Sequence, residues 1–199
     1  MEKNIFKIDL HVHSSERSPC GRATEEAQIR AAIAAKLDAI VFTDHWQYVS
    51  PDQLQQLNEK YAPFIIFGGI EVVADDEDFI VIGVHDKMLN QPGFSYADLY
   101  ALVRKHAGFI ALVHPFRYRN EIKANIERYK PDAIEVRSTN TPPSAEQRIR
   151  ELAARLGIPT LCNSDAHNTD AFGKYHNTLE QIPADERELI GLLKRNTNC

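Results

Sequence analysis

Short runs of apolar, β-branched and aromatic residues recur along the chain, separated by more polar stretches. We predict a strand at each of seven such runs, residues 5–10, 39–43, 64–70, 79–84, 109–113, 133–136 and 160–162. Most of these runs are apolar throughout rather than alternating, which is typical of parallel strands covered on both faces. The pattern therefore favours repeated βα units.

Helix signals fill most of the intervals between these runs. Polar capping residues stand before four amphipathic stretches, at Thr24, Ser50, Ser95 and Ser144. Cations followed by glycine predict helix ends at residues 105–108 and 155–157, and a last helix is expected at about 184–195. Only the acidic turn 75–78 separates the third and fourth strands, so one repeat lacks its helix.

Length and charge limit the classes of protein to consider. A chain of 199 residues that is 43% hydrophobic fits a single domain, residues 1–199, with a sizeable core. Its formal net charge of -5 gives no electrostatic reason to expect tight binding of duplex nucleic acid.

The cysteines and the hydropathy pattern bear on location. Cys20, Cys162 and Cys199 are widely spaced and form no CxxC pair, which argues against a disulfide framework or a zinc finger. No apolar stretch reaches the ~18 residues that span a membrane, and the first residues resemble no signal peptide. We therefore predict a cytoplasmic protein without a membrane partner.

Residues able to bind metal follow the C-terminal ends of the predicted strands. They are His11 and His13, His45, Glu71, His85, His114, and finally Asp165 with His167. In a parallel barrel all strand C-termini open on one face, where the chemistry of such enzymes takes place. Imidazole and carboxylate together suit Zn, Mn or Fe better than Ca or Mg. Scattered histidines with ordinary hydrogen bonds are the alternative, and it explains the whole set poorly.

The same residues resemble the four motifs of the PHP family, named for its polymerase and histidinol phosphatase members. The motifs correspond to residues 9–14, to 43–45, to Glu71 together with 85–115, and to 164–167. The resemblance implies a distorted (β/α)7 TIM-like barrel of the α/β class. It also implies two to three divalent metal ions.

The resemblance assigns ligands to each ion. His11, His13, Glu71 and Asp165 would hold the first ion, Glu71, His85 and His114 the second, and His45 and His167 would belong to a third. The acidic or histidine ligand that the family usually adds after its first motif is missing here. Glu16 or Cys20 could substitute for it, or the third site could be weak or empty, and Cys20 could equally be a small apolar loop residue.

The expected chemistry is hydrolysis of a phosphate ester by a metal-bound hydroxide. Asp9 and Asp44 would orient the imidazoles or, alternatively, cap loop amides. Arg117 and Arg137 are the candidates for binding the substrate phosphate.

Two other functions compete with this prediction. An amidohydrolase would cleave C–N or lactone bonds on a similar barrel, but it calls for a metal-bridging lysine at a strand end, and no predicted strand ends in lysine. A regulatory module that binds metal without turnover is the second. The short chain favours a small phosphate ester or nucleotide as substrate, and the sequence indicates no oligomeric state.

Overall fold

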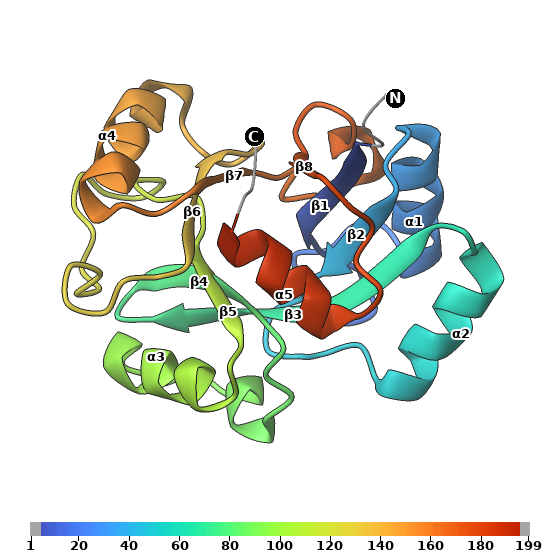
Figure 1. The fold of residues 1–199 in the computed structure, drawn as a ribbon, viewed down its shortest axis with the longest axis horizontal. Coiled ribbons are helices and arrows are strands. Elements are labelled where there is room, and N and C mark those ends of the chain that lie inside the picture. Colours follow the sequence, from blue (N-terminus) through green and yellow to red (C-terminus); the bar gives the residue numbers. More distant parts are fainter. Residues whose placement is uncertain (1–4, 196–199) are drawn as a thin grey trace.

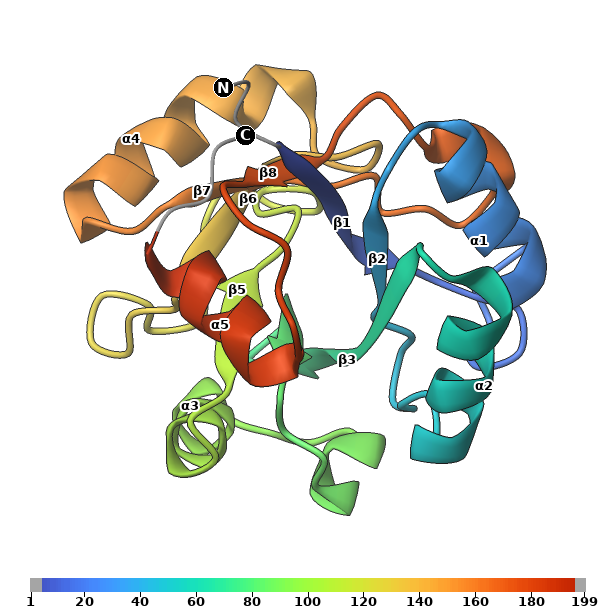
Figure 2. The same ribbon diagram turned by 45° about the vertical axis from the view of Figure 1, so that its right-hand side comes forward.

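The computed structural model describes residues 5–195 and has one mixed sheet that curls into a nearly closed barrel (Figures 1 and 2). The strands are β1 (Phe6–Val12), β2 (Ala39–Phe42), β3 (Ile65–Ala74), β4 (Glu77–Ile82), β5 (Phe109–Leu112), β6 (Ala133–Arg137), β7 (Thr160–Cys162) and β8 (Asn177–Leu179). Their order in the sheet is β7-β6-β5-β4-β3-β2-β1-β8. The predicted TIM-like α/β barrel is confirmed, with one strand more than expected.

Among the described residues, five α-helices flank the barrel: α1 (Glu25–Ala34), α2 (Pro51–Tyr61), α3 (Tyr96–Lys105), α4 (Glu146–Leu156) and α5 (Glu186–Arg195). Thr24, Ser50 and Ser95 cap the first three, as predicted, by accepting hydrogen bonds from backbone amides. Ser144 is not a cap, because a 3-10 turn precedes α4 and Ala145 takes the cap position. Within residues 5–195 the helices are too short and polar to cross a membrane.

The expectation that all predicted strands are parallel is wrong for β4. It pairs antiparallel with both β3 and β5. Asp75 and Asp76 form the link from β3 to β4 with φ values of 49° and 62°. A link of two residues with positive φ joins an antiparallel hairpin, whereas a parallel pair needs a crossover of a dozen residues or more. The start of β4 therefore lies at the C-terminal ends of its neighbours.

The short strand β8 had no predicted counterpart, and it helps to close the barrel. It pairs antiparallel with the first half of β1. On its other side the Asn177 amide donates to the carbonyl oxygen of Cys162 in β7 and accepts from its N–H, at 2.9 and 3.0 Å. At the other end of the barrel, the N–H of Ala166 donates to the carbonyl oxygen of His11. The carbonyl oxygen of Ala166 accepts from the N–H of His13.

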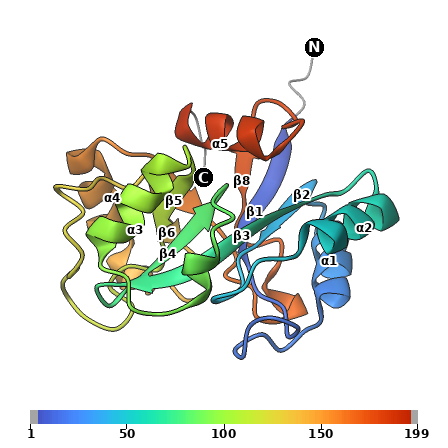
Figure 3. The ribbon, with the colours of Figure 1, turned by 90° about the horizontal axis from the view of Figure 1, so that it is seen from below.

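The barrel interior is apolar at the end where the parallel strands begin. Helix α5 covers that end, as the view from below shows (Figure 3). Its Leu189, Ile190 and Leu193 are buried in one cluster with Ile8 of β1 and Phe109 of β5. This plug leaves the opposite end, where β1, β2, β3, β5, β6 and β7 finish, as the end open for a site.

Candidate metal centre

Four side chains converge at the C-terminal end of the barrel. His11 lies in β1 and His13 directly follows it, so strand alternation directs both rings to the same side. The Nε2 atom of His11 lies 3.4 Å from both Glu71 Oε2 and Asp165 Oδ1. The Nε2 atom of His13 lies 3.2 and 3.3 Å from the same two oxygens. All four residues are at most 1% exposed.

These distances fit a shared cation. Two ligands bound to one Zn²⁺ ion at about 2.0–2.1 Å in a tetrahedral arrangement lie about 3.4 Å apart. His11 Nε2, His13 Nε2 and Asp165 Oδ1 are fully buried polar atoms without a hydrogen-bond partner. Burying such atoms unpaired is costly, and a divalent ion would satisfy all three. The donor set therefore fits the first metal position that the motifs imply.

Glu71 connects this position to two further histidines. Its Oε2 atom lies 3.1 Å from His45 Nε2, and its Oε1 atom lies 3.1 Å from His114 Nε2. The backbones of Glu71 and His45 also form a parallel bridge. Each carboxylate oxygen thus faces a different set of imidazoles, which is the arrangement that a bridging ligand between two ions requires. Asp165 Oδ2 is 3.8 Å from His114 Nε2 and faces the same second position.

Glu135 of β6 orients the site, a role that the sequence analysis did not assign to it. It is fully buried, and its Oε2 atom lies 3.1 Å from His11 Nδ1. Because a carboxylate only accepts, the proton of neutral His11 belongs on Nδ1 and its Nε2 lone pair faces Glu71 and Asp165. A divalent cation would satisfy that lone pair.

The titration of these groups reflects the density of charge. Burial disfavours the charged form of His13, but Asp165 and Glu71 outweigh burial and raise its pKa to about 9. Asp165 and Glu71 likewise raise the pKa of His11 well above its usual value. Burial favours a neutral Glu71, but the imidazoles around it hold its pKa well below the ordinary range. Without metal, protons on the imidazoles balance the carboxylates.

Two residues of the site have a strained backbone conformation. His114 and Asp165 have φ values of 30° and 52°, which non-glycine residues seldom adopt. Such conformations persist only where surrounding contacts hold them, and they cluster at functional sites.

Asp9 and Asp44 bond backbone amides rather than imidazole rings. Asp9 is fully buried and accepts from the amides of His11 and Ser164 at 3.1 Å. Burial raises its pKa to about 7. Asp44 accepts from the amide of Ser14 at 2.6 Å. Of the two roles that the sequence allowed, the structure shows amide capping.

The structure contradicts the assignment of His85 as a metal ligand. Because β4 is antiparallel, His85 follows it at the end of the barrel that α5 covers. Its Nε2 atom lies 2.9 Å from Glu186 of α5, and its side chain is 56% exposed. The residue that β4 places near the centre is Asp78, with Oδ2 3.7 Å from His114 Nδ1. Burial, followed by the nearby Glu71 charge, raises the pKa of Asp78 to about 6.

The two arginines predicted to bind phosphate lie apart. Arg137 is exposed, binds Glu146 of α4 through two hydrogen bonds of 2.9 and 2.7 Å, and is not among the residues that line the pocket beside the metal centre. Arg117 donates to Asn140 at 3.2 Å, and both line an open pocket of about 640 Å³ beside the metal centre. Arg22, which the sequence analysis overlooked, lines the same pocket.

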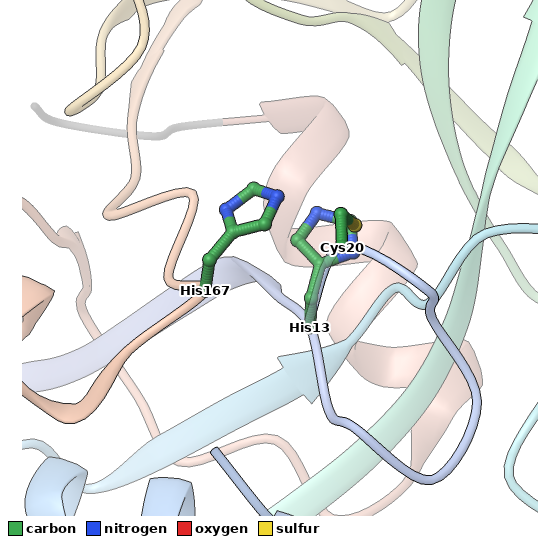
Figure 4. Close-up of side chains that lie close together, drawn as sticks. All are labelled: His13, Cys20 and His167. Carbon is green, nitrogen blue, oxygen red and sulfur yellow. The ribbon is translucent and has the colours of Figure 1, made fainter. Parts of the chain in front are cut away.

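Glu16 and Cys20, the two candidates for the missing ligand, have different surroundings. Both Glu16 carboxylate oxygens accept from the amide of Glu25, at 3.2 and 3.0 Å, so Glu16 caps the start of α1. Cys20 is half-buried and its thiol is not in a disulfide. It lines the pocket together with His167, close to His13 (Figure 4). Burial and then the Glu71 charge raise the pKa of the Cys20 thiol. Cys199 lies outside the described residues.

Comparison with known families gives a match at the C-terminal end of the chain. Residues 143–198 match the family described as PHP-associated. No curated protein sequence matches the chain.

Solved structures match nearly the whole fold. A two-domain protein from Bacteroides vulgatus that contains a predicted PHP-like metal-dependent phosphoesterase has a TM-score of 0.71 and 18% identity, covering 98% of this chain and 64% of its own. The lesion-specific endonuclease PfuEndoQ from Pyrococcus furiosus has a TM-score of 0.66 and 18% identity, covering 94% and 56%. An amidohydrolase from Chromobacterium violaceum, with bound sulfate and no metal, has a TM-score of 0.62 and 16% identity, covering 96% and 97%. At these identities the likeness concerns the fold.

Proposed function

The chain has a PHP-like fold and a PHP-associated C-terminal segment, and on this premise we propose that it is a metal-dependent phosphoesterase acting on a small phosphate ester or nucleotide. The observation that carries the proposal is the convergence of His11, His13, Glu71 and Asp165 within 3.2–3.4 Å, with three of their buried atoms unpartnered.

The ligand roles follow from this geometry. We assign His11, His13, Glu71 and Asp165 to the first ion, and Glu71 and His114 to the second. Bound ions would supply the Lewis acid that activates water and neutralises charge on phosphoryl oxygens. The protein's contribution is to keep the Nε2 lone pairs directed inward and to hold Glu71 between both positions.

The adjoining pocket supports an anionic substrate of limited size. Its volume of about 640 Å³ lies within the range of roughly 300–1,000 Å³ that small-molecule sites occupy. Arg117 and Arg22 contribute to its lining, and a guanidinium can bind phosphate oxygens through two charge-assisted hydrogen bonds. Asn140 links the pocket to the centre, because it accepts from Arg117 and donates to Asp165 at 2.7 Å.

The amidohydrolase reading remains the second candidate, because one structural neighbour carries that name. The pocket favours phosphate, because arginine lines it. The lysine that an amidohydrolase calls for is not among the lining residues. A cytoplasmic location and the absence of tight duplex binding stay predictions from the sequence.

The test is hydrolysis before and after metal exchange. Purified protein is stripped with chelator, replenished with Zn²⁺ or Mn²⁺, and assayed on an aryl phosphate, a nucleotide panel, a short oligonucleotide, and amide and lactone substrates. We expect phosphate release that chelator abolishes and metal restores. Glu71→Gln should be inactive, whereas Glu146→Gln, the same change on the surface, should retain activity. Release of amine or lactone product without phosphate release would favour the amidohydrolase, and metal binding without any turnover would favour a regulatory module.

A further inference from the structure

The side chain of Asn140 connects a residue of the metal centre to an arginine of the pocket. Its Nδ2 atom donates to Asp165 Oδ2 at 2.7 Å, and its Oδ1 atom accepts from Arg117 Nη2 at 3.2 Å. These two charged partners fix the orientation of the amide, because a flipped amide would set its oxygen against the carboxylate and its NH₂ group against the guanidinium. The amide therefore presents its donor to the anion and its acceptor to the cation.

The loop after β6 holds Asn140 in this place. Thr139 donates through its backbone N–H and its hydroxyl to the carbonyl oxygen of Ser164, at 3.1 and 2.9 Å. The backbone N–H of Asn140 itself donates to the hydroxyl of Ser138 at 3.3 Å. Because Ser164 directly precedes Asp165, these bonds tie the loop to the segment that carries the carboxylate. The position of Asn140 is thus set by the backbone as well as by its own side chain.

The bond to Asn140 determines how the Asp165 carboxylate is turned. Asp165 Oδ1 lies 3.4 and 3.3 Å from the Nε2 atoms of His11 and His13, and it is buried without a hydrogen-bond partner. Asp165 Oδ2 accepts from Asn140 at 2.7 Å. Rotation of the carboxylate would break this bond and would turn Oδ1 away from the imidazoles. Asn140 therefore keeps Oδ1 directed toward the first ion, as the hydrogen-bond partner of a ligating carboxylate does.

The same amide positions Arg117 without neutralising it. Arginines elsewhere in the chain pair with carboxylates, as Arg137 does with Glu146 at 2.7 Å. Arg117 forms no such ion pair within residues 5–195. Besides Asn140, its guanidinium contacts the ring of Tyr118, with 5.0 Å between Cζ and the ring centroid. Both partners are neutral, so the positive charge stays available to an anion in the pocket.

We propose that Asn140 is a positioning residue that fixes the Asp165 carboxylate for the first metal ion and holds the uncompensated charge of Arg117 where a substrate phosphate would bind. The inference rests on the proposed metal-dependent phosphoesterase and adds a residue that couples its metal to its substrate anion. A carboxylate at this position would repel Asp165 and neutralise Arg117, and an apolar side chain would release both. Only a neutral group with a donor and an acceptor serves both partners.

Asn140→Leu tests the metal half of the proposal, because leucine has a similar volume and removes both hydrogen bonds. Zinc affinity is measured by competition with a chromophoric chelator, and the visible d–d spectrum of bound Co²⁺ reports the geometry of its ligands. We expect zinc to bind about 10–100-fold more weakly, as is typical when the partner of a ligand is lost, and the cobalt spectrum to change. Asn168→Leu is the matched control and should keep both, because Asn168 lines the same pocket and its side chain makes no capping hydrogen bond.

Asn140→Asp tests the anion half, because it places a carboxylate beside the guanidinium. Zinc-saturated protein is titrated with inorganic phosphate in a calorimeter. We expect phosphate to bind about tenfold more weakly to Asn140→Asp, and to Arg117→Ala by a similar factor, because the new carboxylate neutralises the charge of Arg117. Asn168→Asp adds the same charge to the same pocket and should weaken phosphate binding less.

Folded Asn140→Leu with the zinc affinity and the cobalt spectrum of the wild type would overturn the proposal. Equal phosphate affinities of Asn140→Asp and Asn168→Asp would overturn it as well. Asn140→Ala replaces the leucine variant if thermal unfolding of the metal-free protein shows that leucine is not accommodated. Because neither measurement depends on turnover, these responses in a protein without hydrolysis refute only the phosphoesterase proposal, and an active protein whose Asn140 variants match the wild type refutes only the role of Asn140.

Discussion

Replacing Glu135 by Gln tests whether the residues around the ligands tune the metal. The carboxylate is fully buried and has a partner on each oxygen. Oε2 bonds His11 Nδ1 at 3.1 Å and the Asn163 amide at 2.8 Å, while Oε1 accepts from the amide of His114 at 3.1 Å. In each of these contacts a Glu135 oxygen is the acceptor, so both oxygens must remain acceptors to keep His11 and His114 in place.

Glutamine cannot satisfy this arrangement in either orientation. With its NH₂ group toward His11, it donates to Nδ1 and forces the His11 proton onto Nε2, where the metal should bind. With the NH₂ group toward His114, it faces a backbone N–H. Loss of such an orienting partner typically lowers metal affinity by about 10–100-fold, or roughly 1.4–2.8 kcal/mol.

The assay is Zn²⁺ affinity by competition with a chromophoric chelator, and the control is Glu146→Gln at the start of α4, where the carboxylate accepts from Arg137 and Arg150. An unsatisfied buried donor also destabilises the fold by about 1–3 kcal/mol, so thermal unfolding of the metal-free variants must accompany the titration. Unchanged zinc affinity in folded Glu135→Gln would refute the reasoning. The same conclusion would follow if Glu146→Gln lost as much affinity.

Three further outcomes follow from the site. His85→Ala should leave metal content and turnover unchanged, because its exposed ring binds Glu186 at the far end of the barrel; reduced metal content would restore it as a ligand. Arg22→Ala should raise KM by about tenfold through loss of a charge-assisted hydrogen bond, whereas Arg137→Ala should not, and equal kinetics of both variants would remove Arg22 from the pocket. Zinc affinity should rise as pH increases from 6.5 to about 9, because the raised pKa of His13 means that metal displaces a proton over this range; calorimetry showing no proton release at pH 7 would contradict this.

Much of the fold could be predicted because the apolar runs and the capping residues are strong local signals. Gly157 ends α4 in the left-handed conformation with φ of 67°, as its position after a cation predicted. The direction of β4 was also within reach of the sequence. A link as short as Asp75-Asp76 cannot join parallel strands, and that argument would have excluded His85.

Other features depend on contacts between distant segments. Strand β8 has three residues, and its Asn177 closes the barrel through side-chain bonds to β7 that no local pattern reveals. Glu135 stands at a strand end like the ligands, but only the structure shows its carboxylate behind the ring of His11. Arg137 is the last residue of the same strand and follows a register shift. Its side chain pairs with Glu146 of α4.

The most direct test of the central claim is the metal content of the wild-type protein and of Glu71→Gln after identical replenishment with Zn²⁺. Glu71 Oε2 lies 3.2 Å from His13 Nε2 of the first position, and Glu71 Oε1 lies 3.1 Å from His114 Nε2 of the second. The account predicts two to three bound ions in the wild type and the loss of more than one ion from the variant. Equal metal content in the two proteins, or a wild type that binds none, would contradict a centre built around this carboxylate.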